Sequence, residues 1–369
     1  MKIGILTFPR SQNYGALLQA YGVQHFVEKC GYDVSMIDYW PAYHEEMYKP
    51  FSWQKFRALG IRSKIKYVYT FFFTYIRLKA RRNNTRRFYE KFLYLNKSRK
   101  YDIVIYGSDQ IWRKQHQPTY KYFNPIYWGD EQINAPHKIA YAASMGKYEI
   151  DDERDKEFVK NGLAKFEAIS IREIDLRDNL FKEYGVRYPL VCDPVFLLSK
   201  QDWEQMTNSK YLPKEKYILY YRLQNIKATD LMVEDLAQQT SLPIIEMRGY
   251  IPPFHYGKRY RLTADAQEFI TLINGAEYVV TSAYHGIAMS IIYEKQFFFT
   301  SQKHQANRVQ SLFEILELTD RIIDSENVKK VDLSKRIDYT AVRAKLIPWA
   351  NESRNWLKEQ IKKTDESNH

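Results

Sequence analysis

Cysteine is scarce in this chain, whose 369 residues include only Cys30 and Cys192. The two stand too far apart for a metal-binding motif, and two cysteines do not make the framework of a small secreted domain. So few cysteines are typical of proteins in a reducing compartment, which favours the cytoplasm. No group of His, Cys and acidic residues has the spacing of a metal site, and we expect neither a metal nor a resident cofactor.

Long apolar runs are also missing. The run over residues 67–76 is shorter than the roughly 20 residues that cross a bilayer as a helix. Residues 1–9 have neither the long apolar core nor the small-residue cleavage site of a signal peptide. We therefore expect a cytoplasmic protein, either free or peripheral on the inner face of a membrane.

Acidic residues are almost absent from residues 51–100, which contain 15 Lys and Arg and a single acid, Glu90. The remainder has 41 basic and 43 acidic residues, so the overall charge of +12 comes from this segment. Its cations, including the pairs Arg81-Arg82 and Arg86-Arg87, are mixed with aromatic residues, as in helices that lie on anionic membranes. A basic helical excursion whose aromatics pack on the protein fits equally well. Nucleic-acid binding is not expected, because no recognised binding module accompanies the patch.

Length and apolar content indicate a globular protein of two domains. A chain of 369 residues is too long for one ordinary core, and 45% of it is hydrophobic. Aromatic residues are plentiful at 16%, including 31 Tyr. Such rings line sugar sites and membrane interfaces, but they also fill cores, so their number alone does not assign a function.

Short apolar runs alternate with helical patterns, which indicates parallel β-α-β units. The predicted strands are residues 3–7, 33–38, 101–106, 138–142, 168–171, 217–221, 243–246, 278–281 and 296–300. The predicted helices are residues 14–30, 228–239, 264–275, 284–294, 305–318 and 339–364. We therefore expect an α/β fold of two Rossmann-like domains facing a cleft. The first covers residues 1–190, the second covers 191–335, and residues 336–369 form a helix that packs back on the first domain and a polar tail.

Polar clusters follow four of these strands, at the edge where α/β enzymes bind their ligands. In the first, Asn13 is a good helix cap and Gly15 lets a ligand approach the backbone. A plain capped helix start is the alternative. In the second, Ser108, Asp109 and Gln110 suit recognition of sugar hydroxyls, and Asp109 suits a general base. A tight turn capped by Asp109 is the alternative there.

The third and fourth clusters suit an anionic ligand. Arg172 offers a planar fork to a carboxylate or phosphate, although a salt bridge with Glu173 or Asp175 is the common alternative. In the fourth cluster a strand leads through Ser282 to His285 and into a helix of small residues. The N-terminus of such a helix binds anions, and a histidine there suits proton transfer. A capping histidine in the core is the alternative, but its place at a strand end favours function.

Seven short motifs occur in order between residue 2 and about residue 320. They are the N-terminal strand with Asn13-Tyr14-Gly15-Ala16 and Leu18-Gln19-Ala20, then Gly107-Ser108-Asp109-Gln110-Ile111-Trp112, Tyr141-Ala142-Ala143-Ser144-Met145-Gly146, Ser170-Ile171-Arg172-Glu173, Asp193-Pro194-Val195-Phe196-Leu197-Leu198, Thr281-Ser282-Ala283-Tyr284-His285-Gly286 and Asn307-Arg308. No single motif is specific, but together they resemble the polysaccharide pyruvyl transferase family over nearly the whole chain.

The resemblance implies a fold similar to the two-domain B-type glycosyltransferases. It also implies transfer of a carboxyethylidene group from phosphoenolpyruvate to two hydroxyls of a sugar, in a surface-polysaccharide or lipid-linked oligosaccharide precursor. The first domain would bind the acceptor and the second the donor. Several family members have an arginine where this chain has Ala283. The resemblance then requires a phosphate-binding cation from another position, with Arg222, Arg248 and Arg308 as candidates.

The predicted catalytic residues are His285, for proton transfer, and Asp109, for orienting or deprotonating the acceptor. The predicted binding residues are Arg172, Ser282, Gly286, Asn307 and Arg308 for the donor, and Asn13, Tyr14, Gly15, Gln19, Ser108 and Gln110 for the acceptor. The expected partners are a sugar, which a polyprenyl diphosphate could carry, and an anionic membrane surface at residues 51–100. A nucleotide-sugar-dependent glycosyltransferase is the main alternative, although no clear nucleobase or diphosphate signature is present. A non-enzymatic polysaccharide-binding scaffold at the membrane is another.

Overall fold

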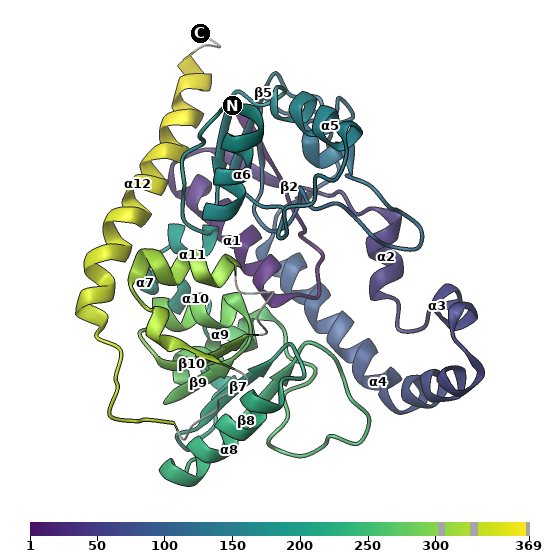
Figure 1. Ribbon diagram of the computed structural model, residues 1–369, viewed down its shortest axis with the longest axis vertical. Helices are drawn as coiled ribbons and strands as arrows, with labels where there is room; N and C mark the ends of the chain where they lie inside the picture. Colours follow the sequence, from purple (N-terminus) through teal and green to yellow (C-terminus); the bar gives the residue numbers. More distant parts are fainter. Residues whose placement is uncertain (302–306, 325–330, 367–369) are drawn as a thin grey trace.

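The computed structural model describes residues 1–301, 307–324 and 331–366 and contains two parallel β-sheets flanked by helices (Figure 1). The first sheet has the strand order β3-β2-β1-β4-β5-β6, and the second has the order β11-β10-β9-β7-β8. The strands are β1 (Lys2–Leu6), β2 (Asp33–Ile37), β3 (Leu95–Asn96), β4 (Ile103–Tyr106), β5 (His137–Ala143), β6 (Ala168–Ile171), β7 (Ile218–Arg222), β8 (Ile244–Arg248), β9 (Tyr278–Thr281), β10 (Gln296–Ser301) and β11 (Ile322–Asp324). The predicted α/β fold with two Rossmann-like units is confirmed.

Helices connect the strands and cover the sheets. They are α1 (Tyr14–Lys29), α2 (Ala42–Tyr48), α3 (Trp53–Ala58), α4 (Ile61–Phe92), α5 (Glu153–Leu163), α6 (Ile174–Tyr184), α7 (Lys200–Glu204), α8 (Lys227–Thr240), α9 (Ala266–Gly275), α10 (Tyr284–Ile292), α11 (Asn307–Leu316) and α12 (Tyr339–Glu366). Short 3-10 turns are η1 (Pro125–Trp128), η2 (Pro194–Leu197), η3 (Ser209–Tyr211) and η4 (Thr319–Arg321).

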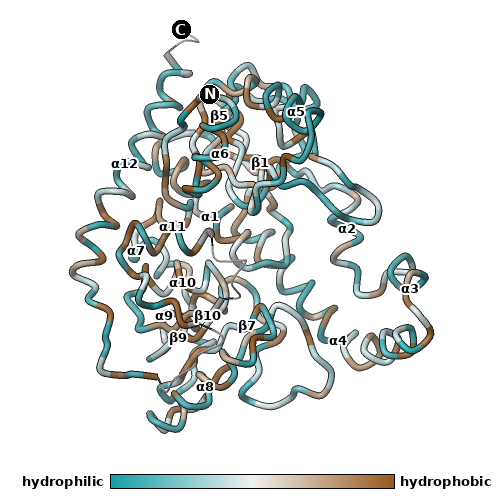
Figure 2. The backbone as a smooth tube through the Cα atoms, viewed as in Figure 1, coloured by the Kyte–Doolittle hydropathy of each residue, from teal (hydrophilic) through white to brown (hydrophobic). Residues whose placement is uncertain are grey.

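The central strands form because their residues are buried on both faces. All four residues of β4 are buried, as are Ile3 and Ile5 of β1, which is the pattern of a parallel sheet covered by helices on each side. Figure 2 shows that hydrophobic residues are also concentrated along β9 and β10 of the second sheet. The strands β3 and β11 were not predicted, because two or three residues at a sheet edge leave no apolar run to detect.

The helix α1 lies between the two units and belongs to a core that both share. Its Tyr14 packs on Phe269 of α9, with ring centroids 5.1 Å apart, and on Tyr221 of β7, with centroids 5.8 Å apart. Gly22 brings the helix against the backbone of η2, since a Cβ there would lie 2.5 Å from the carbonyl oxygen of Pro194. The shared core therefore fixes the position of one sheet relative to the other.

The last helix, α12, returns along the first unit (Figure 1). Its Ser353 accepts a hydrogen bond from the amide of Cys192 at 2.9 Å, and its Arg354 donates to the carbonyl oxygens of Phe196 and Leu197, both at 2.9 Å. Trp356 packs against Tyr141 of β5. These contacts tie the end of the chain to the segment that connects the two sheets.

The basic segment of residues 51–100 forms α3 and the long helix α4, which project from the body (Figure 1). The C-terminal half of α4 is anchored: Arg81 is 4% exposed and donates to the hydroxyl of Tyr14 and to the carbonyl of Gly249. The expectation that Arg81 belongs to a basic surface is therefore wrong, because its side chain is buried and its hydrogen bonds join the two units. Among the helices that the structure describes, none is long and apolar enough to cross a membrane.

The contact of α1 with η2 predicts the effect of Gly22→Ala. The new methyl group meets a backbone oxygen that cannot move aside, so we expect the free energy of unfolding to fall by about 1–3 kcal/mol in urea titrations. Gly60→Ala is the control: nothing lies within 4 Å of its Cβ, and its effect should stay within about 0.5 kcal/mol. Equal stability of the two variants would contradict this packing.

Candidate functional site

A buried network of polar side chains lies where β4, β6 and α1 meet the start of η2. Arg172, which directly follows β6, donates from Nη1 to Asp193 Oδ2 at 2.8 Å and to Ser108 Oγ at 3.1 Å. Gln19 of α1 donates from Nε2 to the same oxygen of Asp193 at 2.5 Å. All four side chains are buried, so a single carboxylate group fixes two elements of the first unit relative to the connection between the sheets.

Arg172 has a second carboxylate partner. Its Nε donates to Glu173 Oε1 at 2.9 Å, and Ser144 Oγ donates to the same oxygen at 2.7 Å. Burial alone would lower the pKa of Arg172, but the charges of Glu173 and Asp193 outweigh it and hold that pKa above its ordinary value. The salt bridge with Glu173, which the sequence left open as an alternative, is present, and Arg172 is a permanently charged part of the network.

His285, in the first turn of α10, approaches Asp193 from the second unit. Its Nε2 lies 3.6 Å from Asp193 Oδ2. Burial alone would raise the pKa of Asp193, but His285 and Arg172 outweigh it and hold that pKa well below its ordinary value. A carboxylate beside an imidazole orients the ring and stabilises the positive charge that the ring takes on with a proton. Asp193 was missing from the predicted site, although the motif Asp193-Pro194 was its signal.

The imidazole of His285 occupies the space beside Gly15. A Cβ at Gly15 would lie 1.9 Å from His285 Nδ1, so another residue at this position displaces the ring. We expected a ligand to approach the backbone here; the structure places the imidazole there instead. The ring of Tyr284 lies edge-on to that of His285 with centroids 5.1 Å apart, and the guanidinium of Arg172 lies 5.5 Å from the centroid of Tyr284. The position of His285 is therefore fixed on several sides.

The N-terminus of α10 has no side-chain cap. Its N-cap residue, Ala283, has no side chain that bonds the first amides. Beside it the buried hydroxyl oxygen of Ser282 has no hydrogen-bond partner within residues 1–301, 307–324 and 331–366. Gly286 packs against Thr281, where a Cβ would lie 2.6 Å from Oγ1. An uncapped helix start next to an unbonded hydroxyl offers several donors to one anionic group.

The arginines considered as substitutes for the one expected at Ala283 are either bonded to acids or have side chains outside the described residues. Arg222 donates to an acid on α8 at 2.7 Å, and Arg248 donates to an acid on its own strand at 2.5 Å. Asn307 and Arg308 begin α11, but their side chains lie outside the described residues. Neither Arg222 nor Arg248 is therefore a free cation.

A cavity of about 220 Å³ opens beside the network, at the ends of β1 and β4. It is lined by Phe8, Ser11, Asn13, Trp40, His44, Met47, Tyr48, Asp109, Gln110, Arg113, Gln115, His116 and Gln117. Asp109 directly follows the Ser108 that bonds Arg172, so the cavity and the network share the end of β4. Asp109 also has a φ of 59°, a left-handed conformation that is uncommon outside glycine and clusters at functional sites.

The predicted acceptor residues divide between these two places. Asn13 and Gln110 line the cavity, and Asn13 also caps α1, as the alternative interpretation expected. Gln19 and Ser108 belong to the buried network. Tyr14 is fully buried between the two units. Asn13 and Gln110, with Asp109, are thus in position to contact a ligand in the cavity. Tyr14, Gln19 and Ser108 are buried and do not line it.

His44 of α2 is a cavity residue that the sequence did not indicate. Its ring lies among Phe8, Trp40 and Tyr43, at centroid distances of 4.8, 4.9 and 4.6 Å. Burial lowers the pKa of His44 to about 4, although the charge of Asp109 acts to raise it. His44 is therefore neutral at physiological pH. The only signal in the sequence was that residues 39–48 follow the strand predicted at 33–38.

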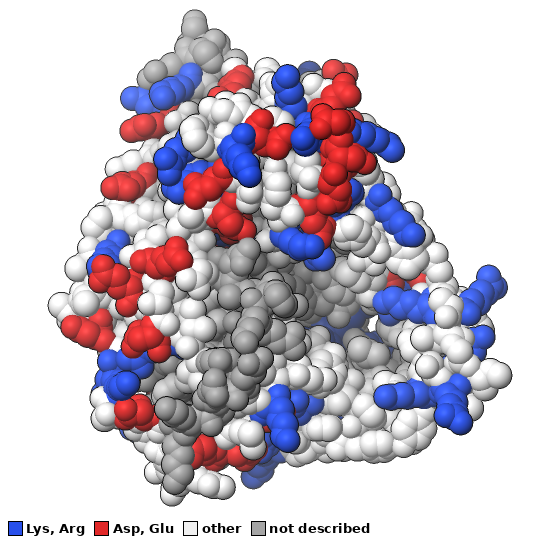
Figure 3. All heavy atoms as spheres, in the orientation of Figure 1, with Lys and Arg blue, Asp and Glu red and all other residues white. Residues whose placement is uncertain are grey.

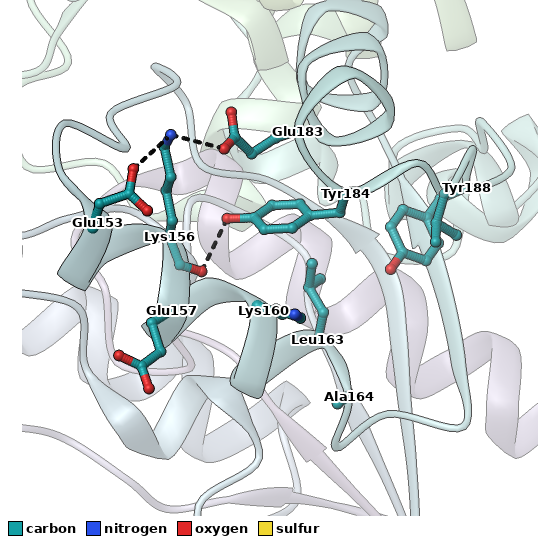
Figure 4. A pocket seen from close by; sticks show the side chains of 10 residues that line it. Glu153, Lys156, Glu157, Lys160, Leu163, Ala164, Glu183, Tyr184 and Tyr188 are labelled. Carbon is teal, nitrogen blue, oxygen red and sulfur yellow. Dashed lines mark hydrogen bonds and ion pairs between the residues drawn. The ribbon is translucent and has the colours of Figure 1, made fainter.

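A larger cavity, of about 730 Å³, lies between α5 and the end of α6 (Figure 4). Its Lys156 is paired with Glu153 and Glu183, each at 3.0 Å, and Tyr184 donates to the carbonyl of Lys156. None of the network residues lines it, and its Lys156 is already paired with two carboxylates. Among the described residues, no group of three His, Cys, Asp or Glu side chains is arranged to hold a metal ion.

The paired charges of the network predict the result of Arg172→Leu. The substitution leaves two buried carboxylates without their cation, and we expect the free energy of unfolding to fall by about 3–5 kcal/mol in urea titrations. Arg177→Leu is the control, because Arg177 pairs with the exposed Asp178 and should change stability by less than about 1 kcal/mol. An Arg172→Leu protein of wild-type stability would show that the network does not support the fold.

The low pKa of His44 predicts a pH-dependent stability. The imidazole of His44 takes up a proton near pH 6.5 in the unfolded chain but only near pH 4 in the folded chain. The contribution of the neutral imidazole to the free energy of unfolding is therefore complete above pH 6.5 and is lost as the pH falls toward 4. Between pH 7.5 and 5 the loss should be about 2 kcal/mol, and His44→Gln should abolish it. His25→Gln, at a partly exposed histidine of α1, serves as control and should keep the wild-type slope. An unchanged slope in His44→Gln would contradict the assignment.

Comparisons with known proteins place this geometry in a family. Solved structures similar to the chain include UDP-GlcNAc 2-epimerase from Neisseria meningitidis (10% identity, 98% of this chain and 100% of that one, TM-score 0.48). Others are UDP-N-acetylglucosamine 2-epimerase from Rickettsia bellii (12% identity, 100% and 97% covered, TM-score 0.49) and a glycosyltransferase from Rickettsia africae (12% identity, 98% of each chain, TM-score 0.48). At these values the similarity indicates nothing about ligand or reaction.

Sequence comparison with curated proteins finds no match. Residues 13–304, however, match the family described as polysaccharide pyruvyl transferase. The match spans most of the chain and includes the ends of β4 and β6, η2 and the start of α10, which together build the network around Asp193. The chain belongs to the polysaccharide pyruvyl transferase family.

Proposed function

We propose that the protein transfers a carboxyethylidene group from phosphoenolpyruvate to two hydroxyls of one sugar, forming a cyclic pyruvate ketal in a surface-polysaccharide or lipid-linked precursor. The observation that carries the proposal is the position of His285. It stands at the N-terminus of α10, which has no side-chain cap, lies 3.6 Å from Asp193, and is connected through Asp193, Arg172 and Ser108 to the cavity at Asp109. Membership of the family supports this reaction.

The donor is a compact anion, and the start of α10 suits it. In the proposal, the amides around Gly286 and the hydroxyl of Ser282 bind its carboxylate or phosphate. Arg308 and Asn307, from the first turn of α11, supply the further contacts that family membership suggests. Arg172 acts indirectly, because its guanidinium is bonded to Asp193 and Glu173; it fixes Asp193 and adds positive potential to the site.

The reaction needs one proton delivered to carbon and two hydroxyl protons removed. His285 as an imidazolium protonates the methylene carbon of the enol, and Asp193 stabilises its charge before that step. The first sugar hydroxyl adds to the resulting oxocarbenium carbon and gives up its proton, which restores the imidazolium. The second hydroxyl then displaces phosphate, and its proton leaves with the phosphate. The products are the methyl-bearing ketal and hydrogen phosphate, which balances atoms and charge.

The cavity at Asp109 is the proposed acceptor site. Its carboxylate and amide groups, with the ring of Trp40, are of the kind that bind a sugar by hydrogen bonds and by stacking. Asp109 orients the first hydroxyl, or takes its proton and passes it to the imidazole of His285, and the neutral His44 accepts or donates a hydrogen bond beside it. An acceptor carried by a polyprenyl diphosphate places the protein at the inner face of the cytoplasmic membrane.

The reaction type is tested by incubating the full chain with phosphoenolpyruvate and a panel of aryl and lipid-linked glycosides. We expect release of phosphate together with a mass gain of one pyruvate ketal on the acceptor. The same panel with nucleotide sugars in place of phosphoenolpyruvate tests the alternative. Glycosyl transfer from a nucleotide sugar without ketal formation would overturn the proposal in favour of a glycosyltransferase.

His285→Gln tests the role of the imidazole. Loss of proton transfer should lower kcat by about 10²–10⁴-fold with little change in stability, because Gln remains polar and similar in size. The control is His25→Gln on α1, which should keep wild-type kcat. Asp109→Asn should mainly raise the acceptor KM or slow its attack, leaving the binding of phosphoenolpyruvate unchanged. Phosphate release at the wild-type rate by His285→Gln would contradict the mechanism.

A further inference from the structure

The N-terminal half of α4 presents an apolar face to solvent. Ile61, Ile65, Phe72 and Ile76 are 79%, 67%, 78% and 80% exposed. Side chains of this size are rarely so accessible in a soluble protein, and here several lie along one helix. An exposed apolar face of this kind indicates a surface that binds a partner.

The helical spacing places these residues on one side. Positions 61, 65, 72 and 76 fall within a single stripe at 3.6 residues per turn, and the half-exposed Val68 lies in the same stripe. The buried residues Thr74, Arg81, Thr85 and Phe88 lie on the opposite side, where α4 packs on the protein. The apolar stripe thus points away from the body, at the end of the helix that projects from it (Figure 1).

Neighbouring segments widen the apolar surface and hold it in place. A groove of about 510 Å³ between α3 and α4 is lined by Phe56, Lys64, Ile65, Val68, Tyr69, Phe72 and Phe73. Phe254, from the loop after β8, packs on Tyr69 and Phe73 with centroids 5.8 and 4.9 Å away. Arg77 anchors that loop by donating to the carbonyl oxygens of residues 252 and 255, both at 2.9 Å. The surface is an ordered part of the fold and includes both units.

Cations surround this apolar face, and the segment that forms it contains no acid. Residues 51–89 contain no Asp or Glu. Lys55, Arg57, Arg62 and Lys66 are exposed on α3 and the first turns of α4. Figure 3 shows Lys and Arg side chains gathered at this projection. A second copy of the chain would bring like charges together here, whereas an anionic bilayer offers both an apolar interior and a negative surface.

We propose that the tip formed by α3 and the N-terminal half of α4 inserts into the interface of a membrane that contains anionic lipids. In this arrangement the stripe of Ile65, Phe72 and Ile76 enters the acyl region and Trp53, which is 66% exposed, lies at the headgroup level. The flanking cations contact lipid headgroups. The inference does not depend on the reaction that the protein catalyses.

The structure also excludes part of the basic segment from this contact. Arg81 is buried, Arg82 pairs with Glu45 at 2.8 Å, and Arg86 lies 3.8 Å from Glu90. These cations belong to the C-terminal half of α4, which packs on the protein. The proposal therefore assigns membrane contact to residues 53–76 and not to the whole of residues 51–100.

Vesicle sedimentation of the full chain tests the apolar part. With vesicles of phosphatidylcholine and phosphatidylglycerol we expect Ile65→Asn/Phe72→Asn to bind about a hundredfold more weakly than wild type, from the loss of two inserted side chains. The control is Phe181→Asn/Leu231→Asn, which removes two exposed apolar residues from α6 and α8 and should bind like wild type. Equal binding by the first variant and wild type would overturn the proposal.

The charged part is tested in the same assay. Lys55→Gln/Arg62→Gln/Lys66→Gln should weaken binding to these anionic vesicles about a hundredfold, at about fivefold for each cation. Arg86→Gln/Arg87→Gln/Lys91→Gln removes the same charge from the other end of α4 and should have a much smaller effect. Equal losses in the two variants would show general electrostatic attraction and no localised docking.

Two further measurements decide what covers the face. Brominated acyl chains should quench part of the tryptophan fluorescence of the wild type, and this part should be absent in Trp53→Phe. In sedimentation velocity without lipid, wild type and Ile65→Asn/Phe72→Asn should have the same oligomeric state. A wild-type dimer that this variant dissociates would mean that a second copy covers the face, and the membrane proposal would fail.

Discussion

The ion pair between Arg172 and Asp193 is the interaction on which the rest of the site depends. Two carboxylates and one guanidinium are buried together, and such charges persist in a protein interior only when each is paired and hydrogen-bonded. Asp193 meets this requirement through three elements at once: Gln19 on α1, Arg172 after β6 and His285 on α10. The contacts that stabilise this one carboxylate therefore connect the first sheet, the segment between the sheets and the second sheet at one point.

The chemistry of the site follows from how these charges are divided. The network leaves His285 beside a carboxylate and next to an uncapped helix start, an arrangement that the proposed function uses for proton transfer and for binding the anionic donor. The cavity around Asp109 is lined by carboxylate, amide, imidazole and aromatic groups and by Arg113, and in the proposed function these groups bind the sugar. Ser108 bonds Arg172 while Asp109 faces the cavity, so adjacent residues of one loop serve the two sides.

The strands and the main helices were predictable because parallel strands are buried on both faces and leave continuous apolar runs, as in β1 and β4. The edge strands β3 and β11 were not, since two or three residues make no pattern. The positions of Ser282, His285 and Asp109 were predictable from their place after strands. His44 was not, because α2 has no distinctive sequence and its cavity forms only when β2, β4 and their loops come together. Arg172 was predicted to bind the donor; the structure shows it bonded to Glu173, which the sequence offered as an alternative partner, and to Asp193, which the sequence did not indicate as its partner.

The sequence by itself determined the α/β class, the family and the location of the basic segment, since these depend on local composition and on the order of motifs along the chain. Only the tertiary structure decided that His285 lies against Gly15, that Arg81 joins the two units while Phe72 and Ile76 face solvent, and that Asp193 lies 3.6 Å from the imidazole of His285. The physical reason is that burial and ion pairing are properties of residues brought together from distant positions. Gln19 and Asp193 are 174 positions apart, and no local pattern at either one indicates the other.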